Sequence, residues 1–410
     1  MSYLSNTTPN QLSVSQDASN RTRVSQSFTL HDGKLLNADS AFQFDTKGTG
    51  TGAFANNKYN MSVTAGQYLI RQTKRYAPYS SGKSQQVEET FDNFQVEANT
   101  VKRVGYFSSI ATGVYDTNYD GFWLENDGTT IRLKAARDGV STLDVAITSW
   151  SGYSQLAEYQ SVANWANFTV VAFDFLWLGG AVLRFFVKTS NGFVLAHIFN
   201  YAGTTTDTFI KSPNQPLRYE IRSSTGTGSL RYICSQVSTE GSIDEVGFNN
   251  AGHSLMAGTG GINSQTVATI GTSYAVCGVR KAATHRDCTL KVSSHDLMVQ
   301  STADYIHYKL VLNPTLSAAL TYTAIANSCA EVGVAGAVAA ISITHTANTG
   351  RVLHEGLLSQ GQPIPYGFLE KDFFSYLGCT IDNVMDEIVL IVTPLTANIT
   401  LNGCLNWKEY

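Results

Sequence analysis

Short runs of alternating apolar and polar residues fill much of the chain, and turn-forming residues separate them. Two of these runs, residues 181–188 (AVLRFFVK) and 193–199 (FVLAHIF), lie on either side of Asn191-Gly192. An Asn-Gly pair readily adopts the positive φ angles of a tight hairpin, and both flanking runs have the composition of strands. The stretch therefore predicts a β-hairpin.

A second hairpin is predicted at Asn126-Asp127-Gly128, because residues 131–135 (IRLKA) alternate apolar and charged positions after it. Such alternation is typical of a strand with one face in water. Similar short segments with turn residues between them continue from about residue 59 to 237. Many short strands at close spacing favour a β-sandwich or jelly roll over an α/β fold.

The chain is expected to be mostly β and to have three parts. Residues 1–50 begin with a polar, Ser/Asn/Thr-rich stretch and are interpreted as an N-terminal arm that docks on a neighbour. Residues 51–254 are predicted to form an antiparallel, lectin-like β-sandwich or jelly roll. Residues 255–410 are predicted to form a second, smaller β domain, in which the Ala-rich residues 316–340 are compatible with helix or strand.

Composition excludes several classes of protein. Only 15% of the 410 residues are charged, the net charge is −4, and there is no block of Lys and Arg, so a nucleic-acid partner is not expected. The most apolar run, residues 169–187, is interrupted by Asp174 and Arg184 and does not predict a membrane span. The polar N-terminal residues do not form a cleavable signal for export.

The six cysteines are scattered over the chain without a CxxC pair. They are interpreted as buried, reduced thiols, with one or two disulfides as the alternative. His285 and Cys288 have metal-ligand spacing, but no second pair lies near them in sequence, so the zinc signal is weak.

A possible calcium loop starts at DTNYDG, in which Asp116, Asn118 and Asp120 occupy the first ligand positions. Asp127 falls at the twelfth position. However, residues 122–125 read as a strand, which would carry Asp127 about 20 Å from Asp120. An Asx-rich turn is therefore the favoured interpretation, bound calcium is the alternative, and no other cofactor is predicted.

No nucleophile elbow or HExxH motif is present, which predicts that the protein is not an enzyme. The presence of a pair of catalytic carboxylates is left open, because such residues come together only in the folded chain. Trp150 and Trp165 stand in polar surroundings and are candidate platforms for a glycan, whereas core packing is the commoner role of tryptophan.

Several segments occur in an order that resembles a family of virion structural proteins from tailed bacteriophages, many of them marine and cyanobacterial phages. The resemblance covers roughly residues 20–240. It rests on residues 29–34 (TLHDGK), 71–85 (RQTKRYAPYSSGKSQ), 102–108 (KRVGYFS), 120–129 (DGFWLENDGT), 173–187 (FDFLWLGGAVLRFFV), 213–221 (PNQPLRYEI) and 229–237 (SLRYICSQV).

The resemblance implies a structural component of the virion, in the tail, neck or fibre apparatus, made in the cytoplasm of the host bacterium. Its expected partners are other virion proteins and further copies of the chain, with a trimer as the usual arrangement of phage fibres. The alternative is a carbohydrate-binding receptor adhesin of the same particle, which contacts a glycan of the host surface. A polysaccharide-degrading enzyme ranks below both.

Overall fold

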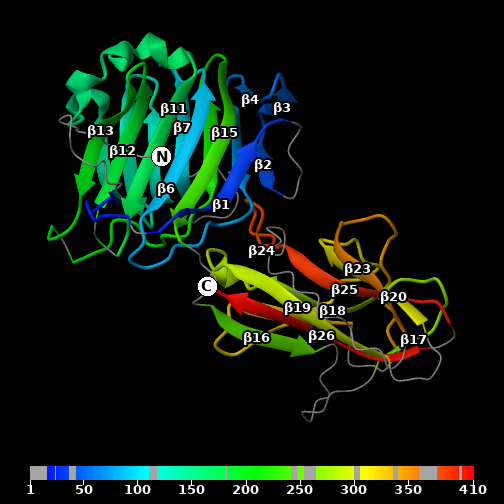
Figure 1. The fold of residues 1–410 in the computed structure, drawn as a ribbon. Coiled ribbons are helices and arrows are strands. Elements are labelled where there is room, and N and C mark those ends of the chain that lie inside the picture. The colour runs from blue at the N-terminus through cyan, green and yellow to red at the C-terminus, as the bar shows by residue number, and fades with distance from the viewer. Residues whose placement is uncertain are drawn as a thin grey trace. The chain divides into compact units, whose positions relative to one another are not determined.

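The computed structural model divides the chain into two compact units, residues 1–245 and 246–410, and each contains two antiparallel sheets (Figure 1). This confirms the mostly-β fold class. The structure describes residues 16–23, 25–36, 43–109, 118–178, 180, 182–204, 206–241, 247–253, 265–299, 305–335, 340–359, 376–396 and 399–410.

The first unit has an eight-stranded sheet. Seven of its strands follow one another in a single spatial order, and the eighth, β1, pairs with β15. In spatial order the other strands are β13 (Gly192–Asn200), β12 (Val182–Thr189), β11 (Thr169–Leu176), β6 (Gln85–Asp92), β15 (Gly228–Glu240), β4 (Lys58–Val63) and β3 (Thr51–Ala55), and β1 is Ser27–Lys34.

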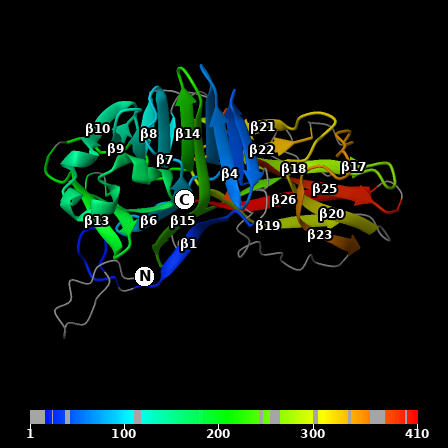
Figure 2. The same ribbon diagram turned by 90° about the horizontal axis from the view of Figure 1, so that it is seen from above.

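The other sheet of the first unit has seven strands. In spatial order these are β10 (Val140–Ala146), β9 (Ile131–Arg137), β8 (Tyr119–Asn126), β7 (Thr100–Ser109), β14 (Leu217–Ser223), β5 (Tyr68–Thr73) and β2 (Phe44–Gly48). Figure 2 shows the strands of the two sheets as separate layers of this unit.

Aromatic side chains fill the space between these two sheets. Phe122 of β8 packs on Phe173 of β11 with ring centroids 5.2 Å apart, and Tyr219 of β14 stacks on Tyr232 of β15 at 4.1 Å. Successive strands such as β4–β5, β6–β7 and β14–β15 pass from one sheet to the other, as in a jelly roll. The first unit is therefore an antiparallel β-sandwich, as the alternation predicts.

Both predicted hairpins are present. Thr189 pairs with Gly192, so Ser190 and Asn191 form the turn between β12 and β13, one residue before the predicted position. Gly192 has φ +114°, which a residue with a side chain rarely adopts. Asn126 pairs with Ile131 at the end of the ladder, so residues 127–130 form the turn between β8 and β9.

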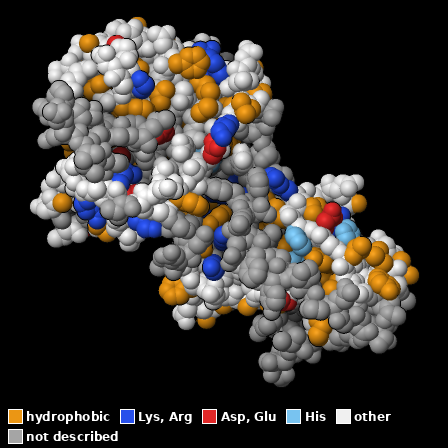
Figure 3. Space-filling view, viewed as in Figure 1, with side chains coloured by type: hydrophobic (Ala, Val, Ile, Leu, Met, Phe, Trp, Pro, Cys, Tyr) orange, Lys and Arg blue, Asp and Glu red, His pale blue; other side chains and the backbone are white. Residues whose placement is uncertain are grey.

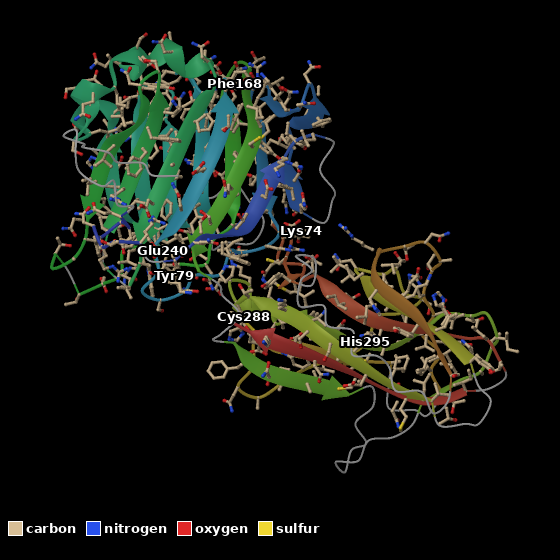
Figure 4. The ribbon with its side chains drawn as sticks, in the orientation of Figure 1. Lys74, Tyr79, Phe168, Glu240, Cys288 and His295 are labelled. Carbon is tan, nitrogen blue, oxygen red and sulfur yellow. A yellow bond between two sulfur atoms is a disulfide. The ribbon has the colours of Figure 1, made fainter. Side chains whose placement is uncertain are left out.

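Four 3₁₀ segments connect β10 to β11 and cover one end of this sandwich (Figure 1). They are η1 (Ile147–Ser149), η2 (Tyr153–Gln155), η3 (Ala157–Tyr159) and η4 (Val162–Ala166). Phe168, 59% exposed, lies at this end (Figure 4).

Part of the predicted N-terminal arm belongs to the sandwich of its own chain. The Ala18 N–H donates to Ser84 Oγ at 3.2 Å, and Arg23 forms an ion pair with Asp174 of β11 at 3.2 Å. Strands β1 and β2 then join the two sheets. The other residues of the predicted arm, 1–15, 24 and 37–42, lie outside the described residues.

The second unit has a five-stranded and a six-stranded sheet. The former contains β16 (Phe248–His253), β26 (Ile399–Glu409), β19 (Leu290–Val299), β24 (Tyr376–Leu377) and, paired with β26, β17 (Gln265–Val267). The latter contains β21 (Thr321–Ala324), β22 (Ala330–Val334), β18 (Tyr274–Lys281), β25 (Glu387–Pro394), β20 (Tyr305–Leu312) and β23 (Arg351–Ser359), and η5 (Ala283–His285) follows β18.

The unit boundary lies at residue 245, nine residues before the predicted one, because β16 pairs with β26 near the end of the chain. The Ala-rich residues 316–340 contain the strands β21 and β22 rather than a helix in their described part. Among the described residues there is no helix long and apolar enough to cross a membrane.

Candidate functional site

The two tryptophans predicted as an exposed platform lie in the core. Trp150 is 3% exposed and Trp165 is 0% exposed. Their indole N–H groups donate to the carbonyls of Val145 and Tyr159, at 3.1 and 3.2 Å. The rings meet edge to face and anchor the 3₁₀ segments on the sandwich, so neither presents a face to a glycan. The platform prediction is therefore corrected.

The described residues of the predicted calcium loop do not assemble an ion site. Asp116 lies outside the described residues, and Asn118 is exposed. Asp120 is buried, and its carboxylate accepts from the backbone N–H groups of Lys211 and Ser212 at 2.7 and 3.0 Å. It also accepts from the Gln215 amide at 2.6 Å, so its oxygens anchor a loop.

Asp127 forms an Asx turn in the predicted hairpin between β8 and β9. One of its carboxylate oxygens accepts from the backbone N–H groups of Thr129 and Thr130, each at 2.8 Å. Asp120 lies at the start of strand β8, whereas Asp127 directly follows the end of this strand. Within the described part of the chain, no three His, Cys, Asp or Glu side chains form a group that could hold a metal ion.

The His285–Cys288 zinc signal also fails, because Cys288 forms a disulfide with Cys329. His285 lies beside Thr284, with 3.0 Å between Nδ1 and Oγ1. Two of the six cysteines thus form a disulfide, whereas Cys234, Cys277 and Cys404 are free thiols.

A different set of polar and aromatic side chains gathers on the outer face of the seven-stranded sheet. On β8, Phe122 points into the core, so the alternating residues Tyr119, Trp123 and Glu125 lie on the other face. Arg103 of β7 pairs with Glu125 in the register and shares this face. We call these side chains, together with Phe107, Lys134, Arg218 and Glu220, the sheet-face network.

Arg103 is the centre of the sheet-face network. Its Nε donates to Glu125 Oε2 at 2.6 Å, and its Nη1 donates to Glu220 Oε2 at 3.0 Å. The same Nη1 donates to the Tyr119 hydroxyl at 3.0 Å, and that hydroxyl donates to Glu220 at 2.9 Å. One guanidinium therefore holds two carboxylates from two different strands.

Further cations and an indole complete the partners of these carboxylates. Lys134 donates to Glu125 Oε1 at 2.7 Å, and Trp123 Nε1 donates to Glu125 Oε2 at 3.2 Å. Arg218 donates to Glu220 Oε1 at 2.6 Å and to Gln72 at 2.7 Å. The network therefore has three cations, Arg103, Lys134 and Arg218, for two carboxylates, and its buried centre without Lys134 is charge-balanced.

Three aromatic rings accompany the charges. The ring centroids of Phe107, Tyr119 and Trp123 are 5.1 to 5.5 Å apart. Glycines lie opposite two of them: a Cβ at Gly105 would lie 2.6 Å from Trp123 Cα, and one at Gly121 would lie 2.6 Å from Phe107 Cα. Glycine at these positions leaves the room that the rings occupy.

The centre of the network is closed to solvent, and its rim is open. Tyr119 and Trp123 are each 4% exposed, whereas the side chain of Lys134 is 24% exposed. Beside Lys134, the exposed pair Arg132–Asp144 is joined at 2.6 Å. A ligand would therefore meet the rim residues on β9 and β10 first.

Electrostatics indicate the chemistry that this face can perform. Burial alone would raise the pKa of the Glu125 carboxyl, but the charges of Arg103 and Lys134 outweigh it and hold this pKa below its usual range. A general acid needs a carboxyl whose pKa is raised. The face therefore offers fixed charges and donors for binding, and no proton donor at Glu125.

Sequence reasoning missed this network, since Arg103, Glu125 and Glu220 are far apart in the chain. The available signal was the alternation in residues 119–125, which puts every second residue on one face. It did not reveal which strands lie beside β8.

Comparisons with known proteins give no family. No protein-family model and no curated protein sequence matches the chain. Among solved structures, the Emp47p carbohydrate recognition domain is similar at 13% identity and a TM-score of 0.34, over 51% of this chain and 95% of that one. A legume lectin-like domain from Entamoeba histolytica is similar at 13% identity and 0.32, over 48% and 89%.

A carbohydrate esterase from the Shiga toxin-encoding bacteriophage phi24B is similar at 10% identity and a TM-score of 0.34, over 53% of this chain and 100% of that one. At such TM-scores these likenesses assign no activity and no ligand to this chain.

Proposed function

We propose that the protein is a carbohydrate-binding adhesin of a tailed-bacteriophage particle, and that its first unit binds a glycan of the host surface at the rim of the sheet-face network. The observation that carries this proposal is the arrangement of Lys134, Arg132 and Asp144 around a buried, charge-balanced centre. Sugar hydroxyls both donate and accept hydrogen bonds, so a rim with ammonium, guanidinium and carboxylate groups suits them.

The buried centre supports binding by fixing the rim. Glu125 Oε1 holds the Lys134 ammonium at 2.7 Å, and Glu125 is itself held by Arg103 and Trp123. Side chains that are already ordered lose less conformational entropy when a ligand binds. A rim held in this way is preorganised for a polar ligand.

The same charges weigh against an enzyme. Hydrolysis of a glycosidic bond commonly uses one carboxylic acid that donates a proton and one ionised carboxylate. In the network Glu125 and Glu220 both accept from Arg103, and the pKa of Glu125 is held low. We therefore propose binding without turnover.

The place in the virion is proposed from the sequence resemblance. The adhesin would be a structural component of the tail, neck or fibre apparatus and assemble with other virion proteins as a homotrimer. Scattered charges on the visible face of the first unit suit a protein without a nucleic-acid partner (Figure 3). Light scattering of the purified chain tests the trimer; a monomeric mass excludes self-assembly in solution.

Glycan binding is tested with the full chain on an array of bacterial surface glycans and on host cells. We expect Lys134→Ala to weaken binding at least tenfold. Lys34→Ala is the matched control, since Lys34 is an exposed lysine in an ion pair on β1 of the other sheet. Equal binding by both variants would exclude this rim, and no binding by the wild type would leave a purely structural role.

A further inference from the structure

Two histidines and a tyrosine meet between the sheets of the second unit. His295 comes from β19 of the five-stranded sheet, whereas Tyr308 and His354 come from β20 and β23 of the six-stranded sheet. The ring centroid of His295 lies 5.3 Å from that of His354 and 5.2 Å from that of Tyr308. Figure 4 labels His295 in this unit.

The imidazoles lack the partners that buried polar groups normally have. His295 is 1% exposed, and neither of its ring nitrogens has a hydrogen-bond partner among the described residues. The buried Nδ1 of His354 likewise has none in the described part of the chain. Because buried polar groups in proteins almost always have a hydrogen-bond or metal partner, these ring nitrogens are available to bind one.

We propose that His295 and His354 together bind one divalent transition-metal ion of the zinc, nickel or copper class. Neutral imidazole is a preferred ligand of these ions. With metal–nitrogen bonds of about 2.0–2.1 Å and a tetrahedral angle, the centroids of two imidazole ligands lie roughly 5 Å apart. The observed separation of 5.3 Å fits this arrangement.

The surroundings define what else the ion would contact. Tyr308 stacks on His354 with centroids 5.8 Å apart, and no third His, Cys, Asp or Glu joins the pair within the described residues. The remaining positions would be taken by water or a small anion.

This chemistry excludes some ions. Calcium and magnesium prefer carboxylate and carbonyl oxygens, which the histidine pair does not supply. A structural zinc site would supply four protein ligands, whereas this one supplies two, so the ion is exchangeable. The proposal concerns the second unit and does not depend on glycan binding by the first.

The test uses the full chain without a histidine tag, stripped with EDTA and then titrated with ZnCl₂ or NiCl₂ in a calorimeter. We expect one ion per chain, with at least tenfold weaker binding in His295→Leu and in His354→Gln. His307→Gln is the matched control, because His307 lies on β20 and its Nε2 is 3.3 Å from Glu355 Oε2. Histidines are visible on this unit's surface (Figure 3), so the control is needed.

His354→Gln keeps the test valid if His295→Leu does not fold, since His354 lies on an edge strand and is only partly buried. Metal bound to the wild type should also raise the melting temperature of the second unit, and His354→Gln should lose this rise. The proposal is overturned if the wild type binds neither ion, or if the folded variants bind as tightly as His307→Gln does.

Discussion

Tyr119 of β8 and Glu220 of β14 are joined across the strand that separates them, with the phenol donating to the carboxylate at 2.9 Å. In the register Tyr119 lies opposite Ser109 of β7, and Glu220 lies opposite Arg103. These positions are six residues apart along β7, so both side chains lean along the sheet to meet. Side chains lying along the sheet pack on one another and are desolvated together.

Removal of the central guanidinium should therefore be costly. We expect Arg103→Met to lower the free energy of unfolding by about 3–5 kcal/mol, because Glu125 and Glu220 would stay buried without their shared cation. Urea unfolding measures the change. The control Arg132→Met breaks an exposed ion pair on the same face and should cost at most about 1 kcal/mol. Equal losses would contradict the network.

A buried carboxyl in the core of the first unit should make stability depend on pH. Glu89 of β6 is 1% exposed, neither of its oxygens has a partner among the described residues, and burial raises its pKa well above the usual range. The folded state then keeps the proton that the unfolded state loses above about pH 4.5. Stability should fall as pH rises through and beyond this value.

Glu89→Gln removes this proton linkage. The variant should be more stable than the wild type at pH 8, and the difference should shrink towards pH 4.5, as read by urea unfolding across the pH range. A difference that does not change with pH would show that Glu89 is ionised in the folded protein.

His295 should give the second unit the opposite dependence. Burial lowers its pKa to about 4, below the value of about 6.5 in an unfolded chain. The unfolded state therefore binds more protons between these values, and stability is lost as pH falls from 6.5 to 4. At roughly 1.4 kcal/mol per pKa unit the loss reaches about 3 kcal/mol.

The measurement is urea unfolding of metal-free protein at pH 7 and pH 4.5, in which a spectroscopic probe monitors the second unit. His295→Leu should flatten the difference between the two pH values. A variant that keeps the full pH dependence would assign it to another group.

The disulfide should stabilise the second unit. Cys288 and Cys329 are 41 residues apart, and closing a loop of this size is worth about 4 kcal/mol in the chain-entropy account. Reduction, or Cys288→Ser with Cys329→Ser, should lower the melting temperature of this unit. Cys234→Ser is the control, since Cys234 is an exposed free thiol. An unchanged melting temperature after reduction would exclude the bond as a stabilising element.

The sequence predicted the sandwich because alternation and turns are local properties. The turn after Asn126 and the strand through residues 131–135 need only near neighbours to be recognised. The local pattern was misleading at Trp150. Polar residues flank it in sequence, but the 3₁₀ segments formed by residues 147–166 bury its ring. The Arg103–Glu220 contact joins positions 117 apart, and no local pattern contains such a pairing.

The position of two late strands has a consequence for synthesis on the ribosome. β15 pairs with β1, β4 and β6, and β26 pairs with β16, β17 and β19, so in each unit one of the last strands to be made joins its earlier partners. The eight-stranded sheet of the first unit must wait for residues 228–240, and the five-stranded sheet of the second for residues 399–409. Until then the nascent chain carries open strand edges, which are the sites where premature pairing with another chain would begin.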